Sequence, residues 1–350
     1  MSLPPALLAW AQLALCAAVI GYAGVKLTVY GNVIADKTGL GGTWVGVIML
    51  ATVTSLPEMV TGLISVTAAD QPDIAVGNVM GACVINLLVF VLIDLTHRSG
   101  SFYQRSNQGH IVSASFGVLM LGFVGFSILL SQDARLAGAG APLLAYIGLG
   151  HVGVYAPLIV MVYAVAMRSV FRFERAQAAV YVDREPDPRP DQSLRQAIGR
   201  YAAAALTVVA AGIALPFIGD QIASTMGWRH SFVGTLFVAL ATTIPEIVVS
   251  VSAVRIGAVT MAVGNLLGSN LFNLFLLAVD DLFYAPGPLF AHASPSHSVS
   301  AFSALMMTGL ALIGLIYRPD GRLFRTVGWI SLVLFAVYLA NSYVVFLFAN

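Results

Sequence analysis

Apolar residues dominate the chain in long runs, and short polar connections separate one run from the next. Ten of these runs extend over about 20 residues, the length that an α-helix needs to cross the hydrocarbon core of a bilayer. The pattern therefore predicts ten membrane-spanning helices, at residues 5–30, 43–68, 72–96, 110–131, 142–168, 197–218, 231–254, 258–281, 299–317 and 326–348.

One polar interruption is much longer than the others. Residues 171–195, FRFERAQAAVYVDREPDPRPDQSLR, are rich in arginine, aspartate and proline. This composition is typical of a solvent-exposed linker. The linker divides the chain into an N-terminal half, 1–170, and a C-terminal half, 196–350, with five predicted spans in each. The expected fold class is an all-α polytopic membrane protein.

The composition supports this class and excludes others. Hydrophobic residues make up 59% of the chain and charged residues 9%, whereas soluble domains are typically about 25% charged. A net charge of +1 gives no support for binding nucleic acid. Cys16 and Cys83 match neither a disulfide framework nor a metal-binding motif. The expected partner is the lipid bilayer, and no cofactor is expected.

The distribution of lysine and arginine predicts the orientation, because these residues are retained on the cytoplasmic side of a membrane. With the N-terminus outside, only Arg135 and Arg229 fall on the external side, while Lys26 lies within the first span. We therefore expect a protein of the bacterial inner membrane, with both termini outside and the linker in the cytoplasm. The basic residues at cytoplasmic ends are then Lys37, Arg98, Arg105, the arginines from 168 to 200, Arg255, Arg318, Arg322 and Arg325.

Two regions of the chain are copies of each other. GVIMLATVTSLPEMVTGLISV, from Gly46, aligns with GTLFVALATTIPEIVVSVSAV, from Gly234. The spans that follow also align, AVGNVMGACVINLLVF from Ala75 with AVGNLLGSNLFNLFLL from Ala262. A match of this length indicates an internal repeat.

The number of spans between the copies predicts that the second copy is inverted. Five spans separate them, and five is odd, so the two copies cross the bilayer in opposite directions. Inverted repeats are typical of secondary transporters, which bind substrate near the midplane on interrupted helices. Pro57 and Pro245 fit this prediction, because proline breaks a helix and frees backbone carbonyls.

Glu58 and Glu246 are the acidic residues that fall deep within predicted spans. An ionisable group at that depth costs at least ~2.5–3.5 kcal/mol on insertion scales, so its presence indicates a cavity or a counter-ion. Lys26 is expected to extend to the interface, which leaves no basic partner at that depth. A glutamate follows a proline in each copy of the repeat, so a purely structural role for the two glutamates is the less favoured alternative. The expected partner is a ligand.

The other polar side chains of the repeats carry oxygen atoms. Hydroxyl, amide and carboxylate oxygens suit hard cations such as Ca²⁺ or Na⁺, and the lack of Cys/His clusters argues against zinc or copper. Two carboxylates neutralise one divalent ion. A role in helix packing stays open for each of these residues taken alone. They are Thr54, Ser55, Thr61, Thr242, Thr243 and Ser250 on the first spans of the repeats, and Asn78, Asn86, Asn265, Ser269 and Asn273 on the second, with Gly77, Gly81, Gly264 and Gly268 allowing close helix approach.

Three aspartates lie near the ends of predicted spans. Asp94, Asp280 and Asp281 are expected to be solvated or interfacial. Alternatively, Asp94 and Asp280 could line an entry path for ions.

TSLPE and TTIPE, each followed by AVGNxxGxxxxN, resemble the two α-repeats of the cation/calcium exchanger superfamily, and most closely its prokaryotic sodium/calcium exchanger-like members. The resemblance covers the four core spans, at about 43–96 and 231–281, and the ten-span layout. It implies antiport of Ca²⁺ against Na⁺ or H⁺ by alternating access, with the first and sixth spans sliding past the core.

The resemblance also implies a set of cation ligands. Some positions depart from the family pattern: Val53 and Ala241 replace the glycine that opens the motif, Ala82 replaces a serine, and Asn273 stands where some exchangers carry an acid. With two negative charges, the site is expected to exchange one Ca²⁺ for about two monovalent cations. Asn273, at the position of that acid, is a further candidate ligand. Carried over by position, the ligands are Glu58, Glu246, Thr54, Ser55, Thr242, Thr243, Asn86 and Ser269, plus backbone carbonyls near Ala51 and Ala239.

Three alternatives stay open. The scaffold could transport another load, such as Mg²⁺ or Mn²⁺, or exchange Na⁺ for H⁺. It could be a channel or a passive scaffold. An intramembrane enzyme is the least favoured, because GxSxG, HExxH and paired-aspartate motifs are absent and His151 is the one candidate base within a span.

Overall fold

The computed structural model describes residues 5–38, 54–96, 103, 109–136, 150–178, 193–255, 259–319, 322–323 and 327–348. Eight helices in these ranges are long and apolar enough to cross a membrane, and a bent pair, residues 230–242 and 244–255, makes up to nine. A short antiparallel ribbon, β1 (Arg322–Leu323) with β2 (Val327–Gly328), precedes the last helix. The helices are α1 (Pro5–Thr38), α3 (Leu56–Thr67), α4 (Pro72–Thr96), α5 (Gly109–Leu136), α6 (Tyr155–Ala178), α7 (Leu194–Met226), α8 (His230–Val233), the π-helical turn η2 (Gly234–Val238), α9 (Ala239–Thr242), α10 (Ile244–Arg255), α11 (Val259–Phe283), α12 (Leu289–His292), α13 (His297–Tyr317) and α14 (Trp329–Leu347).

The polytopic helical fold predicted from the sequence is confirmed. Predicted spans one, three, four, five, six, eight, nine and ten each overlap one long helix, and the seventh overlaps the bent pair. The second is described only from Thr54 onward, so the number of ten stays a prediction. The linker and the two halves likewise stay predictions, and most of the linker lies outside the described residues.

The fifth predicted span differs most from the structure. It was expected at 142–168, whereas α6 begins at Tyr155 and continues to Ala178. Gly150 has a φ of +69°, so the chain turns just before the helix. At the other end, the helix extends into the predicted linker, because helix-forming residues propagate a helix beyond the point where the apolar run stops.

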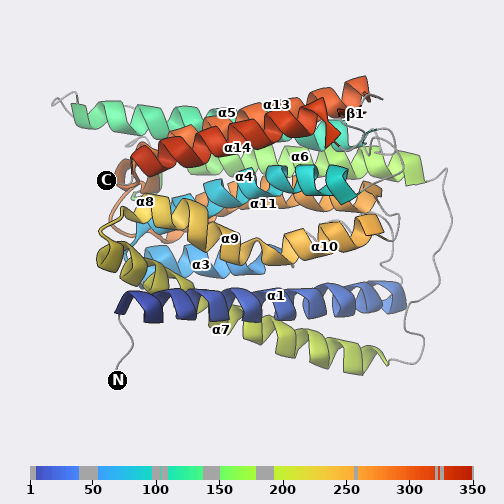
Figure 1. Cartoon of the computed structure of the whole chain (residues 1–350), viewed down its shortest axis with the longest axis horizontal. Coiled ribbons are helices and arrows are strands. Elements are labelled where there is room, and N and C mark those ends of the chain that lie inside the picture. The colour runs from blue at the N-terminus through green and yellow to red at the C-terminus, as the bar shows by residue number, and fades with distance from the viewer. Residues whose placement is uncertain are drawn as a thin grey trace.

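The centre of the bundle is formed by α4 and α11, whose apolar residues are spread around the whole helix and not along one stripe. Within their most apolar stretches, 89% of α4 and 78% of α11 are buried inside the protein, against 22% of α1 and 22% of α6. A helix that is hydrophobic all round is buried on all sides. In Figure 1 these two helices run through the middle, with α5, α13 and α14 along one edge and α1 and α7 along the other.

Two helices start in the middle of the bundle. Pro57 lies in the first turn of α3 and Pro245 in the first turn of α10, where the missing backbone N–H of proline is tolerated. The helix α9 ends at Thr242, and the chain bends by 46° there before α10. From this central region, α3 and α10 run to opposite ends of the bundle (Figure 1).

The long helices α1 and α7 pack against these two helix starts. A Cβ atom added at Gly24 of α1 would lie 2.5 Å from Cγ of Pro245, and one at Gly21 would lie 2.7 Å from Ile244. On α7, a Cβ at Gly212 would lie 3.0 Å from Val60 of α3. Glycine at these positions therefore lets both long helices lie directly on the two helix starts.

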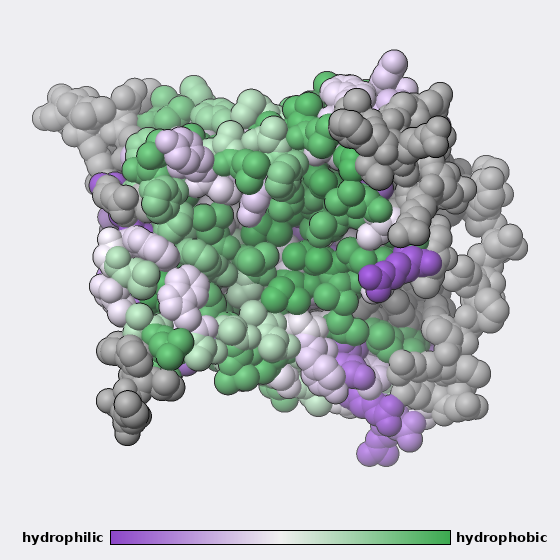
Figure 2. All heavy atoms as spheres, viewed as in Figure 1, coloured by the Kyte–Doolittle hydropathy of each residue, from purple (hydrophilic) through white to green (hydrophobic). Residues whose placement is uncertain are grey.

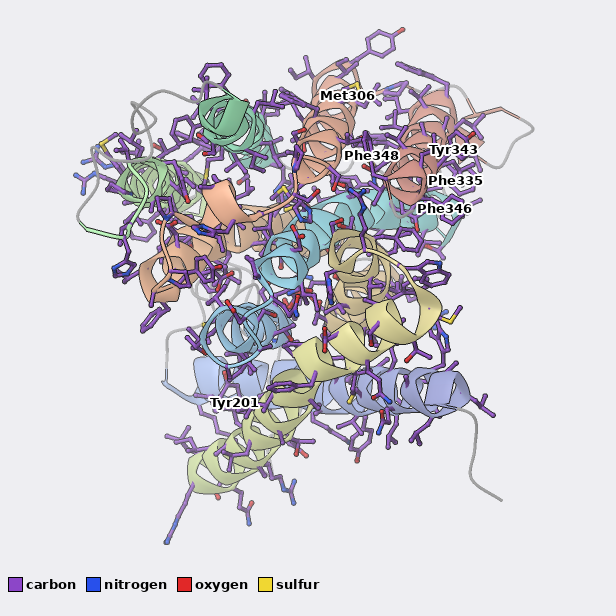
Figure 3. All side chains as sticks on the ribbon, turned by 90° about the vertical axis from the view of Figure 1, so that its left-hand side faces the viewer. Tyr201, Met306, Phe335, Tyr343, Phe346 and Phe348 are labelled. Atoms are coloured by element: carbon purple, nitrogen blue, oxygen red, sulfur yellow. The ribbon has the colours of Figure 1, made fainter. Side chains whose placement is uncertain are left out.

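The surface has the pattern of a membrane protein. Figure 2 shows a hydrophobic band (green) across the visible face, with hydrophilic residues (purple) toward the two ends of the view. Large apolar side chains are exposed at the edge of the bundle, among them Met306 on α13 and Phe335 and Tyr343 on α14, which are labelled in Figure 3. Such a band is stable in contact with lipid tails.

Candidate functional site

Glu58 and Glu246 lie at the two helix starts. Glu58 is in the first turn of α3 and Glu246 in the first turn of α10, and both side chains are fully buried. The N-terminal end of a helix carries a partial positive charge, which favours a carboxylate there. The sequence therefore places each acid where the backbone partly compensates its charge.

Each glutamate contacts a hydroxyl from the other repeat. The Ser55 Oγ atom donates to Glu246 Oε1 at 3.0 Å, and the Thr243 Oγ1 atom lies 3.4 Å from Glu58 Oε1. The Thr243 hydroxyl has a single proton and lies closer, at 2.7 Å, to the carbonyl oxygen of Ala239. The contact to Glu246 is therefore the stronger of the two.

A second pair of contacts also joins the two copies of the repeat, in this case through threonine and asparagine side chains. The Thr242 hydroxyl donates to Asn78 Oδ1 at 2.9 Å, and the Thr54 hydroxyl lies 3.5 Å from Asn265 Oδ1 and 3.5 Å from Ser269 Oγ. Both asparagines were noted in the sequence as oxygen-bearing candidates. In the structure they orient the threonines of the opposite repeat.

Oxygen atoms of both glutamates remain without a hydrogen bond. Among the described residues, Glu58 Oε2 and Glu246 Oε2 are buried with no partner. The ion pairs within the same ranges join His230 to Asp220 and His297 to Asp73, and neither includes a glutamate. A buried carboxylate without a basic partner is stable only when a proton or another cation compensates it. These two oxygens are therefore suited to bind a cation.

The amides predicted as ligands are less completely bonded than the hydroxyls. Asn86 Nδ2 donates to Asn270 Oδ1 at 3.0 Å, while Asn86 Oδ1 is buried without a partner among the described residues. Both polar atoms of Asn273 are also buried without a partner there. Asn86 and Asn273 occupy equivalent positions in the two repeats, so each half contributes an unbonded amide oxygen.

Two predicted backbone ligands have different outcomes. The Ala239 carbonyl oxygen already accepts from the Thr243 hydroxyl at 2.7 Å and from the Thr243 amide at 3.0 Å, and it lies 3.1 Å from the Thr242 hydroxyl. It would have to release a donor before it could bind a cation. Ala51 and Val53 lie outside the described residues.

Asn270 is a residue of this region that the sequence analysis missed. Its Nδ2 atom donates to the Cys83 carbonyl at 3.2 Å, and its Oδ1 atom accepts from Asn86. Asn270 and Cys83 occupy equivalent positions in the two copies, and this contact joins α11 to α4. Because cysteine stands at the matching position, comparison of the two copies did not single out the asparagine.

The expectation that Asp94, Asp280 and Asp281 are solvated or interfacial was wrong. All three side chains are buried, with exposed fractions of 1%, 1% and 0%. Asp281 accepts from the Gly153 amide at 2.8 Å, the Tyr155 hydroxyl at 2.5 Å and the Leu289 amide at 2.7 Å. It therefore holds the start of α6, a role that span positions alone do not reveal.

Asp94 has the equivalent role in the other repeat. It accepts from the Gly328 amide and from the Ser331 hydroxyl, each at 2.7 Å, and thus holds the start of α14. Tyr103 lies nearby, outside the spans. Burial, and then the negative charge of Asp94, raise the pKa of Tyr103 well above its usual range, so this phenol stays neutral.

In the described ranges, no group of three or more His, Cys, Asp or Glu side chains could hold a metal ion. A cation in this region would depend on the two glutamates together with hydroxyl and amide oxygens. Calcium and sodium accept such ligands.

Comparison with known proteins identifies the family. The sequence model of the family described as "Sodium/calcium exchanger protein" matches residues 8–168 and 197–344. The sodium/calcium exchanger MaX1 of Methanosarcina acetivorans is 36% identical over 133 residues, which are 37% of this chain and 35% of that protein. The match thus spans about a third of the length of that relative. The inner membrane protein YrbG of Escherichia coli is 22% identical over 96% of this chain and 97% of its own.

Solved structures share the fold. The H⁺/Ca²⁺ exchanger CAX has a TM-score of 0.66 at 13% identity, covering 96% of this chain and 84% of that chain. The sodium-calcium exchanger NCX_Mj has a TM-score of 0.61 at 18% identity, covering 95% of this chain and 97% of that chain. The family model confirms the resemblance to cation/calcium exchangers, whose members are transporters and not enzymes. The chain belongs to the sodium/calcium exchanger protein family.

Proposed function

We propose that the protein is a secondary antiporter that exchanges Ca²⁺ for Na⁺ or H⁺ across the membrane by alternating access. Membership of the exchanger family supports cation/calcium exchange in general. The observation that carries the specific proposal is the pair of buried glutamates, each in the first turn of a helix that starts in the middle of the bundle and each with an oxygen that has no partner among the described residues. Two carboxylates supply the charge that one Ca²⁺ requires.

The proposed site takes its ligands from both repeats. Ca²⁺ prefers six to eight oxygen ligands, so the two carboxylates need hydroxyl, amide and carbonyl oxygens beside them. The reciprocal contacts of Ser55 and Thr243 with the glutamates support a shared site. The proposed ligands are Glu58, Glu246, Thr54, Ser55, Thr242, Thr243, Asn86, Ser269, Asn273 and the carbonyls of Ala51 and Ala239.

An inverted repeat explains why the contacts are reciprocal. In such an architecture the two copies are related by a pseudo-twofold axis in the membrane plane, and the site lies where they meet. The opposite directions of α3 and α10 support this arrangement (Figure 1). So does the equivalence of Asp94 and Asp281, each of which holds a helix of the other half.

Movement of α1 and α7 is the proposed route to alternating access. Both helices lie directly on the two helix starts through glycine, as at Gly24 against Pro245 and Gly212 against Val60. Small residues leave a smooth contact along which one helix slides past another. The two helices would expose the site to one side of the membrane at a time, with both termini outside and the linker in the cytoplasm.

The charge of the site sets the proposed stoichiometry. Two carboxylates are neutralised either by one Ca²⁺ or by two monovalent cations, so the exchange moves little net charge. Asn273 and Ala82 provide neither an additional charge nor a hydroxyl for a third monovalent ion. A transport current that scales with Ca²⁺ flux at fixed voltage would contradict this ratio.

Counterflow in proteoliposomes tests the function. Vesicles loaded with radioactive Ca²⁺ are expected to release it only when Na⁺, H⁺ or Ca²⁺ is supplied outside, and Mg²⁺ and Mn²⁺ serve as competitors. Glu58→Gln and Glu246→Gln should each lower the rate about 100-fold, because one charge of the ion loses its partner.

Asp70→Asn is the matched control. Asp70 is an exposed acid between α3 and α4, and asparagine tolerates its positive φ of 52°. It should transport like the wild type. Release without any counter-ion would indicate a channel, and full activity of both glutamine variants would exclude the proposed site.

A further inference from the structure

Asp280 is a buried acid outside the proposed cation site. It lies near the end of α11, with an exposed fraction of 1%, and its Oδ2 atom has no hydrogen-bond partner among the described residues. The neighbouring Asp281, in contrast, accepts three hydrogen bonds. The two adjacent acids are therefore in different environments, one fully bonded and one left without a donor.

The carboxyl group of Asp280 lies against Gly62 of α3. A Cβ atom added at Gly62 would be 2.6 Å from Asp280 Oδ2 and 2.9 Å from Oδ1. Gly62 follows Glu58 by four residues, so the two lie on one face of α3, roughly 6 Å apart along the helix axis. The absence of a side chain at Gly62 gives Asp280 its place beside α3, one helical turn from the proposed cation site.

A second polar residue, Asn273, lies on the same face of α11, nearer to the centre of the bundle. Asn273 precedes Asp280 by seven residues, or about two helical turns, and lies on the same face. Its amide is fully buried and unbonded among the described residues. Unbonded polar atoms thus occur at Asn273 and Asp280, with the buried Leu276 and Leu277 in the turn between them.

This position is not duplicated in the other repeat. The residue equivalent to Asp280 on α4 is Ile93, and the residue equivalent to Gly62 on α10 is Ser250, which accepts a hydrogen bond from Asn265. Asp94 and Asp281, in contrast, are equivalent to each other and have equivalent roles. Asp280 is therefore an addition to the symmetric framework and not a part of it.

The surroundings of Asp280 favour a proton over a metal ion as its ligand. A metal ion of the Ca²⁺ type needs several oxygens around it, whereas a proton needs one. The oxygens of Asp281 are already occupied by their three donors, and a buried carboxyl group without donors is stable as the neutral acid. Among the side chains that the structure describes, the titratable groups around this end of α11 are Glu58 on α3, Asp73 on α4, His151 and Tyr155 at the start of α6, Tyr284, His292 on α12, and Asp281 itself.

Several of these groups are bound to other partners. His151 contacts the Leu282 carbonyl at 2.9 Å, Tyr155 donates to Asp281, and His292 contacts the Pro288 carbonyl at 3.0 Å. Asp73 lies 3.0 Å from His297. Asp280, in contrast, has an oxygen without a donor in the described part of the chain, and it lies beside Gly62, about one turn along α3 from Glu58.

We propose that Asp280 is a proton-binding site coupled to the cation site, at the end of the bundle where α3 and α11 finish (Figure 1). Its carboxyl group releases one proton to that side when Ca²⁺ binds at the glutamates, and takes one proton up when Ca²⁺ leaves. The ionised form then contributes a negative charge about one turn from Glu58, which stabilises the bound divalent ion. This inference rests on the proposed function of Glu58 and Glu246.

Proton release during Ca²⁺ binding tests the proposal. CaCl₂ is titrated into purified protein in weakly buffered detergent solution, with a pH indicator and a Ca²⁺ electrode. Asp280→Asn, which keeps the shape of the side chain, should release roughly one proton fewer per Ca²⁺ than the wild type. Its Ca²⁺ affinity should also rise less steeply between pH 6 and 8.

Asp281→Asn is the neighbouring control. It should release as many protons as the wild type but unfold at a lower temperature, because three donors lose their charged acceptor. Asp280→Asn should unfold within a few degrees of the wild type. If Asp280→Asn fails to fold, Asp280 has a structural role and the proposal is wrong.

Other outcomes separate the two proposals. An unchanged proton count in Asp280→Asn, with Ca²⁺ binding that depends on Glu58, would overturn the proton site alone. An unchanged proton count combined with a lost response to Na⁺ would make Asp280 a sodium site and overturn the assignment of a proton. If the wild type bound no Ca²⁺, the proposed function itself would fail.

Discussion

The N-terminal half brings Glu58 and Asn78 to the middle of the bundle on α3 and α4, and the C-terminal half brings Glu246 and Asn265 there on α10 and α11. The glutamates and the asparagines that orient the opposite threonines are present in both halves. So are the two aspartates that hold α6 and α14. These residues form a framework that both copies of the repeat retain.

The residues between these fixed positions differ. In the aligned repeats, Ala82 is equivalent to Ser269, Cys83 to Asn270, and Ile93 to Asp280. In each pair the C-terminal half has the more polar residue. Under the proposed function, the shared framework would bind the divalent ion, and the asymmetric positions would affect which monovalent ion replaces it.

The largest expected effect concerns a stabilising role that the two halves share. Asp281→Asn and Asp94→Asn should each lower the free energy of unfolding by about 2–3 kcal/mol, because the amide removes the charged acceptor that holds the start of α6 or of α14. Thermal unfolding in detergent measures both variants against the wild type. An unchanged stability of either variant would show that this aspartate does not act through these bonds.

A smaller difference is expected at the hydroxyls that contact the glutamates. Ser55→Ala should weaken Ca²⁺ binding about tenfold, because Ser55 donates to Glu246 at 3.0 Å. Thr243→Ala should weaken it only about threefold, since Thr243 lies 3.4 Å from Glu58 and donates to Ala239. Calcium titrations at one pH compare the two, and a stronger effect of Thr243→Ala would contradict the geometry.

The smallest effect is expected from making the halves more alike. Ala82→Ser gives α4 the hydroxyl that Ser269 supplies on α11. An added oxygen should help a monovalent ion to compete, so the Na⁺ concentration that half-inhibits Ca²⁺ uptake should fall about threefold. Leu87→Ile, a buried substitution on the same helix without a new oxygen, serves as control. A variant that responds to Na⁺ like the wild type would exclude Ala82 from the site.

Much of this framework could be predicted from the sequence. Glu58 and Glu246 stand out because an acid after proline in an apolar run is expensive and occurs twice. The helical class follows from the length of the apolar runs. The equivalence of Asn78 and Asn265 is also visible in the aligned copies.

The contacts between the copies could not be predicted in the same way. Ser55 and Glu246 are 191 positions apart, and their bond depends on how the starts of α3 and α10 pack. Asp94, Asp280 and Asp281 were misjudged because position near a span end does not tell whether other helices cover the residue. Asn270 was not predicted because the equivalent residue in the other copy, Cys83, has no amide side chain.

The proposed function requires that the two glutamates jointly hold one Ca²⁺. Calorimetric titration of purified wild type, Glu58→Gln, Glu246→Gln and the double variant tests it directly. We predict one Ca²⁺ per chain in the wild type and a loss of about 100-fold in affinity for each single variant, with little further loss in the double variant, because the two residues share one ion. Tight binding by either single variant, or losses that add in full, would contradict a shared site.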